Sequence, residues 1–408
     1  MLVGIFGYLF QIVVGRLLAP EEFALFSSLI ALYMLLGSPL VFVNMLIVKR
    51  ISVLRAIKQL KGLGNFYLKL QKYLFSFAII FILIAYGSQG FLELYIKNIS
   101  KPQAIVLGLL FSANLFFAVN NSFLQGLQFF GLQSLTHVLF AVGKLIFGVI
   151  FIVVGFGVFG GLLGVTLATA LSVLLGCFFL ATTFKGEENK CPPSTQSVIS
   201  IDSGSLSILI MSIAFALLTQ FDMILVNWLY TPEQAGMYAA ASVLGKAVLY
   251  IPSGLVIALF PMIVEGAVSE KNTIHILKLA LLTTFAMCGC LAIIYFFFGE
   301  VLIHLVYGQA YVDAGGLLRW YGVAMLPLAL IIVLEHYLIA HGRALFSWIF
   351  LAISPLQAIA VYLWHENLIN VVISIACCGI ILLLIGVLLV GKDIISSKAI
   401  GSTEASSI

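Results

Sequence analysis

Long apolar segments separated by short polar breaks make up most of the chain. Most are longer than the roughly 18 apolar residues that a membrane-spanning helix needs. Their apolar residues run continuously, whereas the strands of a membrane barrel alternate over about ten residues. Backbone in lipid must satisfy its own hydrogen bonds, so the pattern predicts helices. Twelve are predicted, over about residues 2–18, 22–48, 73–96, 103–124, 130–154, 158–184, 205–229, 236–264, 274–298, 317–340, 344–364 and 367–391.

The composition excludes a soluble domain. Of the 408 residues, 62% are hydrophobic and only 9% are charged, and the mean hydropathy is +1.19. Soluble domains carry about 25% charged residues. The predicted fold class is therefore an all-α polytopic membrane protein. The six cysteines show no zinc-ligand spacing and no disulfide framework, so we interpret them as small apolar fillers and expect no metal and no cofactor.

An internal repeat organises these helices. The turn at Pro20-Glu21 recurs at Pro232-Glu233, and Gly126 between two apolar runs recurs at Gly342. The two offsets are nearly equal and close to half the chain length, which indicates a duplication. Six helices per repeat place both halves in the same orientation, related by a pseudo-two-fold axis along the membrane normal. The predicted organisation is an N-terminal six-helix lobe (1–184), a polar cytoplasmic linker (185–204), a C-terminal six-helix lobe (205–391) and a loose cytoplasmic tail (392–408).

The distribution of positive charge predicts the orientation. With both termini in the cytoplasm, fourteen of the twenty lysines and arginines fall in cytoplasmic segments and two on the opposite face. Seven lie in the basic stretch 49–72, which contains no acid. Nucleic-acid binding would be another reading of this stretch, but a cytoplasmic loop under the positive-inside rule explains it better. We therefore expect no nucleic-acid partner, and contact with membrane lipids instead.

Charged residues inside the apolar segments are the candidates for function, because each costs roughly 2.5–3.5 kcal/mol on insertion scales. Lys246 follows Asp222 by one helix, so the two are either a cavity lining or a structural ion pair. Lys144 has small neighbours and is expected to face a cavity, whereas Arg16 lies near a helix end and can either face a cavity or reach the interface. The other charged candidates are Arg319 and Glu335; uncharged polar candidates are Asn44, Asn114, Asn120, Asn121, Gln125, Gln220 and Asn227.

Several classes of function lack their motif. The chain has no phosphate-binding loop of an ATPase and no nucleophile motif with a plausible triad. Glu335, His336 and His341 are not spaced to share one helix face as metal ligands. The longest predicted outer loop, about 299–316, is modest for a catalytic domain. We therefore expect no enzymatic activity.

Several motifs resemble the bacterial polysaccharide transporter family of the multidrug/oligosaccharidyl-lipid/polysaccharide exporter superfamily. They cover nearly the whole chain and comprise Gly15-Arg16-Leu17-Leu18-Ala19-Pro20-Glu21-Glu22-Phe23, Gln125-Gly126-Leu127-Gln128-Phe129-Phe130, the glycine-rich turn 155–161, Phe221-Asp222-Met223-Ile224-Leu225-Val226 and the segment 231–241. The family usually has a longer leader and a full first helix, so the natural start of the segment 2–18 is expected upstream.

The resemblance implies two six-helix lobes that rock around a central cavity lined by the segments 2–18, 22–48, 205–229 and 236–264. It implies an undecaprenyl-pyrophosphate-linked oligosaccharide as substrate, flipped across the bacterial inner membrane for surface polysaccharides such as O-antigen or lipopolysaccharide. Other membrane proteins of polysaccharide assembly are possible partners. A pyrophosphate crossing a low-dielectric region needs cations, which Lys144, Lys246 and Arg16 can supply, and Asn44 falls on one of the cavity-lining segments. The substrate-binding candidates are therefore Arg16, Asn44, Lys144 and Lys246, and the ion-coupling candidates are Asp222 and Glu335.

Two alternatives remain. An ion-coupled small-molecule or multidrug exporter of the same superfamily would need fewer cavity cations and would depend more on an acid such as Asp222. A membrane-embedded glycan polymerase or ligase would be expected to carry a large outer loop with catalytic residues.

Overall fold

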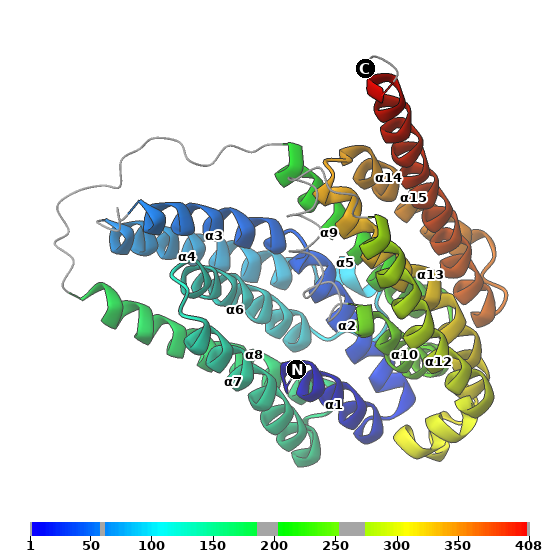
Figure 1. The fold of residues 1–408 in the computed structure, drawn as a ribbon. Coiled ribbons are helices and arrows are strands. Elements are labelled where there is room, and N and C mark those ends of the chain that lie inside the picture. The colour runs from blue at the N-terminus through cyan, green and yellow to red at the C-terminus, as the bar shows by residue number, and fades with distance from the viewer. Residues whose placement is uncertain (1, 58–61, 186–202, 253–273, 406–408) are drawn as a thin grey trace.

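A computed structural model describes residues 2–57, 62–185, 203–252 and 274–405, and these residues are almost entirely helical (Figure 1). Ten helical stretches in this part of the chain are long and apolar enough to cross a membrane. One of them, residues 130–184, contains two helices, and α1 is a shorter apolar helix beside them. The predicted all-α polytopic membrane fold is confirmed.

The N-terminal lobe contains the helices from α1 to α8. Their bounds are α1 (Leu2–Leu17), α2 (Pro20–Gly37), α3 (Leu40–Ala56), α4 (Leu63–Gly87), α5 (Gln89–Glu93), α6 (Lys101–Gly126), α7 (Phe130–Phe151), η1 (Ile152–Phe156) and α8 (Gly157–Phe184). The predicted break at Gly37-Ser38-Pro39 separates α2 from α3. Pro39 caps α3, at a position where its missing N–H costs no helical hydrogen bond.

Polar contacts and small residues hold the N-terminal lobe together. The amide oxygen of Asn120 in α6 accepts hydrogen bonds from Tyr67 Oη (2.8 Å) and Gln71 Nε2 (2.9 Å) of α4. A side chain at Gly164 in α8 would lie 2.3 Å from the backbone nitrogen of Gly148 in α7. These two helices therefore pack backbone to backbone, as small residues allow in membrane bundles.

The C-terminal lobe repeats the plan. Its elements are α9 (Ser203–Leu229), α10 (Pro232–Gly245), η2 (Lys246–Leu249), α12 (Ile274–Tyr307), η3 (Gln309–Tyr311), α13 (Ala314–Ala340), α14 (Ala344–Leu363) and α15 (Leu368–Ala405). Thr231 caps α10 in a capping box with Gln234, and Pro232 occupies the first turn, where it is tolerated best.

The lobes meet where the repeated Pro-Glu motifs begin α2 and α10, an end of the molecule that we call the Pro-Glu end. A side chain at Gly236 would lie 2.2 Å from the carbonyl oxygen of Pro20, so the two motifs touch. Lys97 Nζ donates to the carbonyl of Tyr230 (2.7 Å), and Tyr311 Oη donates to the carbonyl of Leu18 (2.9 Å).

The lobes diverge at the opposite end. In Figure 1 the Pro-Glu end lies at the lower edge. The ends of α3, α4 and α8 that point away from it lie at the left, and the corresponding ends of α9, α14 and α15 lie at the top. The described part of the molecule is therefore closed by interlobe contacts at one end and spread at the other.

Several predicted boundaries are wrong. The basic stretch 49–72 was expected to be a loop, but α3 continues to Ala56 and α4 begins at Leu63, with Arg50 over the ring of Phe66 at 4.3 Å. Lys69 and Lys72 are exposed on α4, so their charges stay out of the packed core and the helix begins before the predicted start at residue 73. Likewise α12 extends to Tyr307 through the first half of the predicted outer loop, and α15 continues through the predicted tail to Ala405.

Four predicted segments fall partly outside the described residues. The parts not described are 58–61 of the basic stretch, 186–202 of the linker, 253–264 of the segment 236–264 and 406–408 of the tail. The domain boundaries therefore stay predictions.

Candidate functional site: a cavity between the lobes

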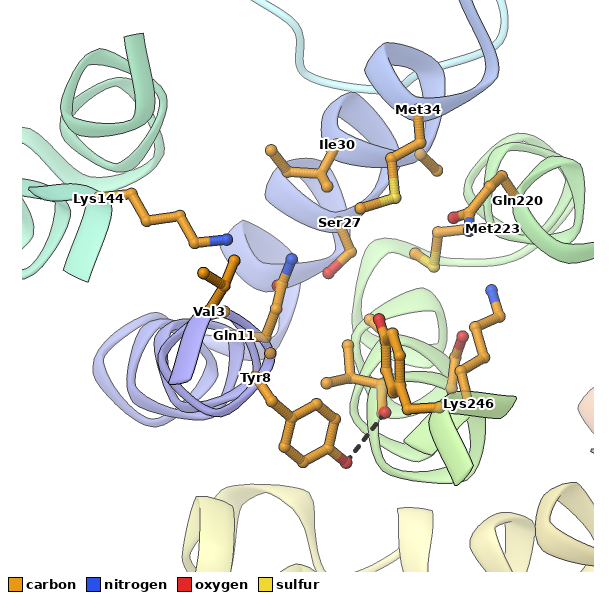
Figure 2. Close-up of a pocket in the computed structure, with 17 residues that line it drawn as sticks. Val3, Tyr8, Gln11, Ser27, Ile30, Met34, Lys144, Gln220, Met223 and Lys246 are labelled. Carbon is orange, nitrogen blue, oxygen red and sulfur yellow. Dashed lines mark hydrogen bonds between the residues drawn. The ribbon is translucent and has the colours of Figure 1, made fainter. Parts of the chain in front are cut away.

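A cavity of about 250 Å³ lies between the lobes, lined by α1, α2 and α7 on one side and by α9, α10 and η2 on the other (Figure 2). Its apolar walls include Val3, Ile30 and Met34. Its polar lining includes Gln11, Ser27, Lys144, Gln220, Ser242 and Lys246. The first turns of α1 reach the cavity because Gly4 and Gly7 add no bulk there.

Lys144 enters this cavity from α7 of the N-terminal lobe (Figure 2). Its ammonium nitrogen lies 5.4 Å from the centre of the Phe10 ring and 5.1 Å from that of Phe140. No carboxylate among the described residues forms an ion pair with it. Two aromatic faces thus stabilise the cation weakly, since each such contact contributes about 0.5–2 kcal/mol. The side chain remains able to bind an anion.

Lys246 reaches the cavity from the opposite lobe, at the start of η2 (Figure 2). Its Nζ lies 3.2 Å from Oδ1 of Asp222, which is fully buried in α9. Tyr238 and Tyr321 donate to the other carboxylate oxygen at 2.7 and 2.8 Å. Asp222 is thus enclosed by three donors behind the cavity wall, and Lys246 connects it to the cavity.

Two further polar groups of the cavity have no hydrogen-bond partner in the described part of the chain. The side-chain oxygens Gln11 Oε1 and Ser27 Oγ are buried and accept no hydrogen bond from the described residues. Buried polar atoms normally have partners, and an exception calls for an explanation such as a ligand or water. Nearby, Tyr8 Oη donates to the carbonyl of Val243 in α10 at 3.1 Å and joins the two lobes at the cavity edge (Figure 2).

The cavity lining is cationic. Among the described residues that line it, Lys144 and Lys246 carry charge and none is an aspartate or a glutamate. Asp222 neutralises one of the two lysines from behind, which leaves Lys144 as the uncompensated charge. In a cavity walled by apolar helices, such a charge attracts an anionic group more strongly than it would in water.

The other predicted site residues lie elsewhere. Arg16 is exposed at the end of α1, where its Nη1 donates to the carbonyl of Leu305 at 3.3 Å. Glu335 is half-buried in α13 and lines neither this cavity nor the second pocket described below. Arg319 forms an ion pair with Glu300 (2.6 Å) away from the cavity. These positions do not gather with the two lysines.

Asn44 lies in a different pocket, of about 320 Å³, between α3, α6 and α7 of the N-terminal lobe. Its Oδ1 accepts a hydrogen bond from Ser122 Oγ at 2.8 Å. The family resemblance predicts Asn44 in the central cavity with Lys246, whereas in the structure it lines this separate pocket.

Sequence reasoning missed Tyr8, Gln11, Ser27 and Ser242 of the cavity. Gln11 interrupts the apolar run Leu9-Phe10-Gln11-Ile12-Val13, which is the same signal that drew attention to Gln220. Serines in a helix often bond to their own backbone and so carry no such signal.

Comparisons with known proteins agree with this architecture. The family model described as "Polysaccharide biosynthesis protein" matches residues 1–267. A search of curated protein sequences found no match.

Solved structures of the same fold include three transporters. An inward-facing multidrug resistance MATE family transporter of the MOP superfamily has a TM-score of 0.75 and 17% identity, covering 96% of this chain and 95% of that one. An outward-facing multidrug resistance MATE family transporter of the MOP superfamily has a TM-score of 0.60 and 17% identity, covering 97% of this chain and 94% of that one. The lipid II flippase MurJ in an inward closed conformation has a TM-score of 0.69 and 15% identity, covering 95% of this chain and 86% of that one. The chain is thus a multi-pass membrane protein with the fold of MOP superfamily transporters, and it belongs to the polysaccharide biosynthesis protein family.

Proposed function

We propose that the chain is a flippase for an anionic, lipid-linked oligosaccharide, which it moves across the bacterial inner membrane by alternating access. The substrate is a polyprenyl-pyrophosphate-linked sugar unit for surface polysaccharide synthesis. Both termini face the cytoplasm, as the excess of positive charge on that side indicates. Residues 185–204 join the lobes on the same side.

The observation that carries this proposal is a cavity between the lobes with two lysines and no carboxylate in its described lining. A pyrophosphate entering a low-dielectric region needs cations and hydrogen-bond donors to replace its water. Lys144 and Lys246 enter the cavity from opposite lobes, so each lobe offers one cation to an anionic headgroup in the cavity. The lipid tail would stay in the bilayer while the headgroup crosses.

The shape of the molecule supports loading from the cytoplasm. The Pro-Glu end is closed by Lys97, Tyr311 and the contact of Gly236 with Pro20, whereas the other end is spread (Figure 1). With the termini inside, the spread end faces the cytoplasm, where lipid-linked sugars are assembled. Rocking of the lobes would break the Pro-Glu contacts and release the headgroup on the other side.

The two alternatives find less support. An exporter of cationic drugs would benefit from a free acid in the cavity, but Asp222 is already bonded to Lys246, Tyr238 and Tyr321. A glycan polymerase or ligase would need a catalytic outer loop, but the end of α12, η3 and the start of α13 occupy most of the segment expected to form that loop. We therefore propose transport without catalysis. Asp222 would hold Lys246 in place, and Glu335 remains a candidate for ion coupling.

Reconstituted protein tests the proposal. Proteoliposomes would carry a fluorescent undecaprenyl-pyrophosphate-linked sugar, and a membrane-impermeant quencher would report its movement between leaflets. We expect wild-type protein to translocate it, Lys144→Ala and Lys246→Ala to slow translocation at least tenfold, and Lys278→Ala, at an exposed position of α12, to have no effect. Wild-type protein that fails to translocate this lipid but exports a cationic dye would sink the flippase proposal.

A further inference from the structure

The second pocket, of about 320 Å³, is built from uncharged polar side chains. Its lining includes the amides Asn44, Asn114, Asn121, Gln125 and Gln133 together with His137. They come from α3, α6 and α7, which frame the pocket inside the N-terminal lobe. None of the described residues that line it is a lysine, arginine, aspartate or glutamate. The pocket is therefore polar enough for a hydrophilic ligand but offers no fixed charge to hold an ion.

Part of the pocket wall is held rigidly. Thr136 Oγ1 donates to Asn121 Oδ1 at 3.0 Å, and Asn121 Nδ2 donates to the carbonyl of Phe117 at 2.9 Å. Ser122 Oγ likewise donates a hydrogen bond to Asn44 Oδ1. These bonds fix the positions of two amides without help from a ligand, which lowers the entropic cost of binding.

The other amides are free to bind something. Among the described residues, none hydrogen-bonds the side chains of Asn114, Gln125 or Gln133. Each such amide presents two N–H donors and a carbonyl acceptor. Sugar hydroxyls are both donors and acceptors, so three unpartnered amides match them, whereas a phosphate offers acceptors alone.

The aromatic groups of the pocket fit the same ligand. Phe117 lines it, and the His137 ring meets the Phe117 ring edge to face at 5.2 Å between centroids. A pyranose ring has an apolar C–H face as well as polar edges. An aromatic surface beside several amides can contact both parts of one sugar.

The pocket lies in line with the cationic cavity along two helices. On α7, His137 precedes Lys144 by seven residues, which is two helical turns on the same face and about 10 Å. Near the end of α2, Met34 lines the cavity and Gly37, one turn further, lines the pocket. A group about 10 Å from a phosphate held at Lys144 would therefore reach the amides.

We infer that this pocket binds the sugar part of the substrate while Lys144 and Lys246 hold its pyrophosphate. The inference rests on the proposed function and extends it, because it divides recognition between a charge-selective cavity and a neutral, hydroxyl-selective pocket. The distance between the two sites fits a diphosphate followed by one or two sugar rings. Sugars beyond the second would extend past the pocket.

Binding of two matched probes tests the inference. Purified protein in nanodiscs would be titrated with farnesyl pyrophosphate and with the same lipid carrying a pyrophosphate-linked disaccharide. We expect Asn114→Leu and Gln133→Leu to weaken binding of the glycosylated probe about tenfold and of the bare probe less than twofold. Lys144→Met should weaken both, and Asn367→Leu, on an exposed turn far along the chain, neither.

The outcomes separate this inference from the proposed function. Equal affinity of wild-type protein for the two probes, or amide variants that weaken both equally or neither, would overturn the glycan pocket and leave the flippase proposal standing. If the amide variants act as expected but Lys144→Met changes neither affinity, the pocket binds the sugar and Lys144 does not bind the pyrophosphate. Wild-type protein that binds neither probe would overturn both.

Discussion

Lys246 Nζ lies 3.2 Å from Asp222 Oδ1, so the charge that enters the cavity is anchored by a carboxylate that is itself fully buried. The pair connects α9 to η2, and the hydroxyls of Tyr238 and Tyr321 complete the shell of the carboxylate. One residue of the pair faces the cavity and the other faces the core. Substitutions on the two sides of the pair should therefore have different consequences.

Loss of Lys246 should destabilise the protein as well as slow transport. Lys246→Met leaves Asp222 as an uncompensated buried charge, and breaking a buried pair in this way costs about 3–5 kcal/mol. The melting temperature in detergent should fall clearly. Adding Asp222→Asn to this variant should recover most of the loss without restoring transport. A single variant that melts like the wild type would contradict the structural role of the pair.

Lys144 should behave in the opposite way. No carboxylate among the described residues depends on it, so Lys144→Met removes a costly charge without orphaning a partner. Stability should stay unchanged or rise, while translocation of the pyrophosphate-linked lipid falls at least tenfold. The measurement pairs a thermal melt with the proteoliposome assay. A large fall in melting temperature would show instead that Lys144 is part of the core.

Gly236 should control closure of the Pro-Glu end. An alanine there would place its Cβ 2.2 Å from the carbonyl oxygen of Pro20, so the two backbones must separate. We expect Gly236→Ala to populate an opened Pro-Glu end and to slow transport. Spin labels at the exposed residues Leu94 and Glu366 would report a longer distance. Gly289→Ala is the matched control, because no atom lies within 4 Å of its added Cβ.

Tyr311 should also stabilise the closed Pro-Glu end, but with a smaller effect than Gly236. Its hydroxyl is buried and donates to the carbonyl of Leu18 across the lobes at 2.9 Å. Removing such a bond costs about 0.5–1.5 kcal/mol, which is roughly a fivefold shift between closed and opened populations. Tyr311→Phe should therefore raise the opened fraction in the spin-label experiment, and Tyr73→Phe, on an exposed face of α4, should not. Identical distance distributions for both variants would refute a role in closure.

The sequence predicted the fold well because lipid restricts the choices. The apolar runs within the described residues, the repeat of Pro20 at Pro232 and the break at Pro39 all correspond to features of the structure. The predicted helix boundaries are wrong where a charged residue is interpreted as the end of a helix. Lys69 and Lys72 lie on an exposed face of α4, and a helix can continue through such positions as long as its other face packs.

The candidate site was only partly predictable. Charge inside an apolar run pointed to Lys144 and Lys246, which the structure brings to one cavity. The same criterion also selected Arg16 and Glu335, which lie elsewhere, because a one-dimensional pattern does not tell which helix face meets the cavity. Tyr238 and Tyr321 carried no signal at all, since a buried tyrosine resembles any other apolar position until its hydroxyl finds Asp222.

The most direct test of the central claim is to locate the anion. A cryo-electron microscopy map of the protein in nanodiscs, bound to an undecaprenyl-pyrophosphate-linked disaccharide, would show where the phosphates lie. The account predicts phosphate density between the two lobes, within ion-pair distance of Lys144 Nζ and Lys246 Nζ. Phosphate density bound elsewhere, for example at the exposed Arg16, with the cavity between the lysines empty, would contradict it.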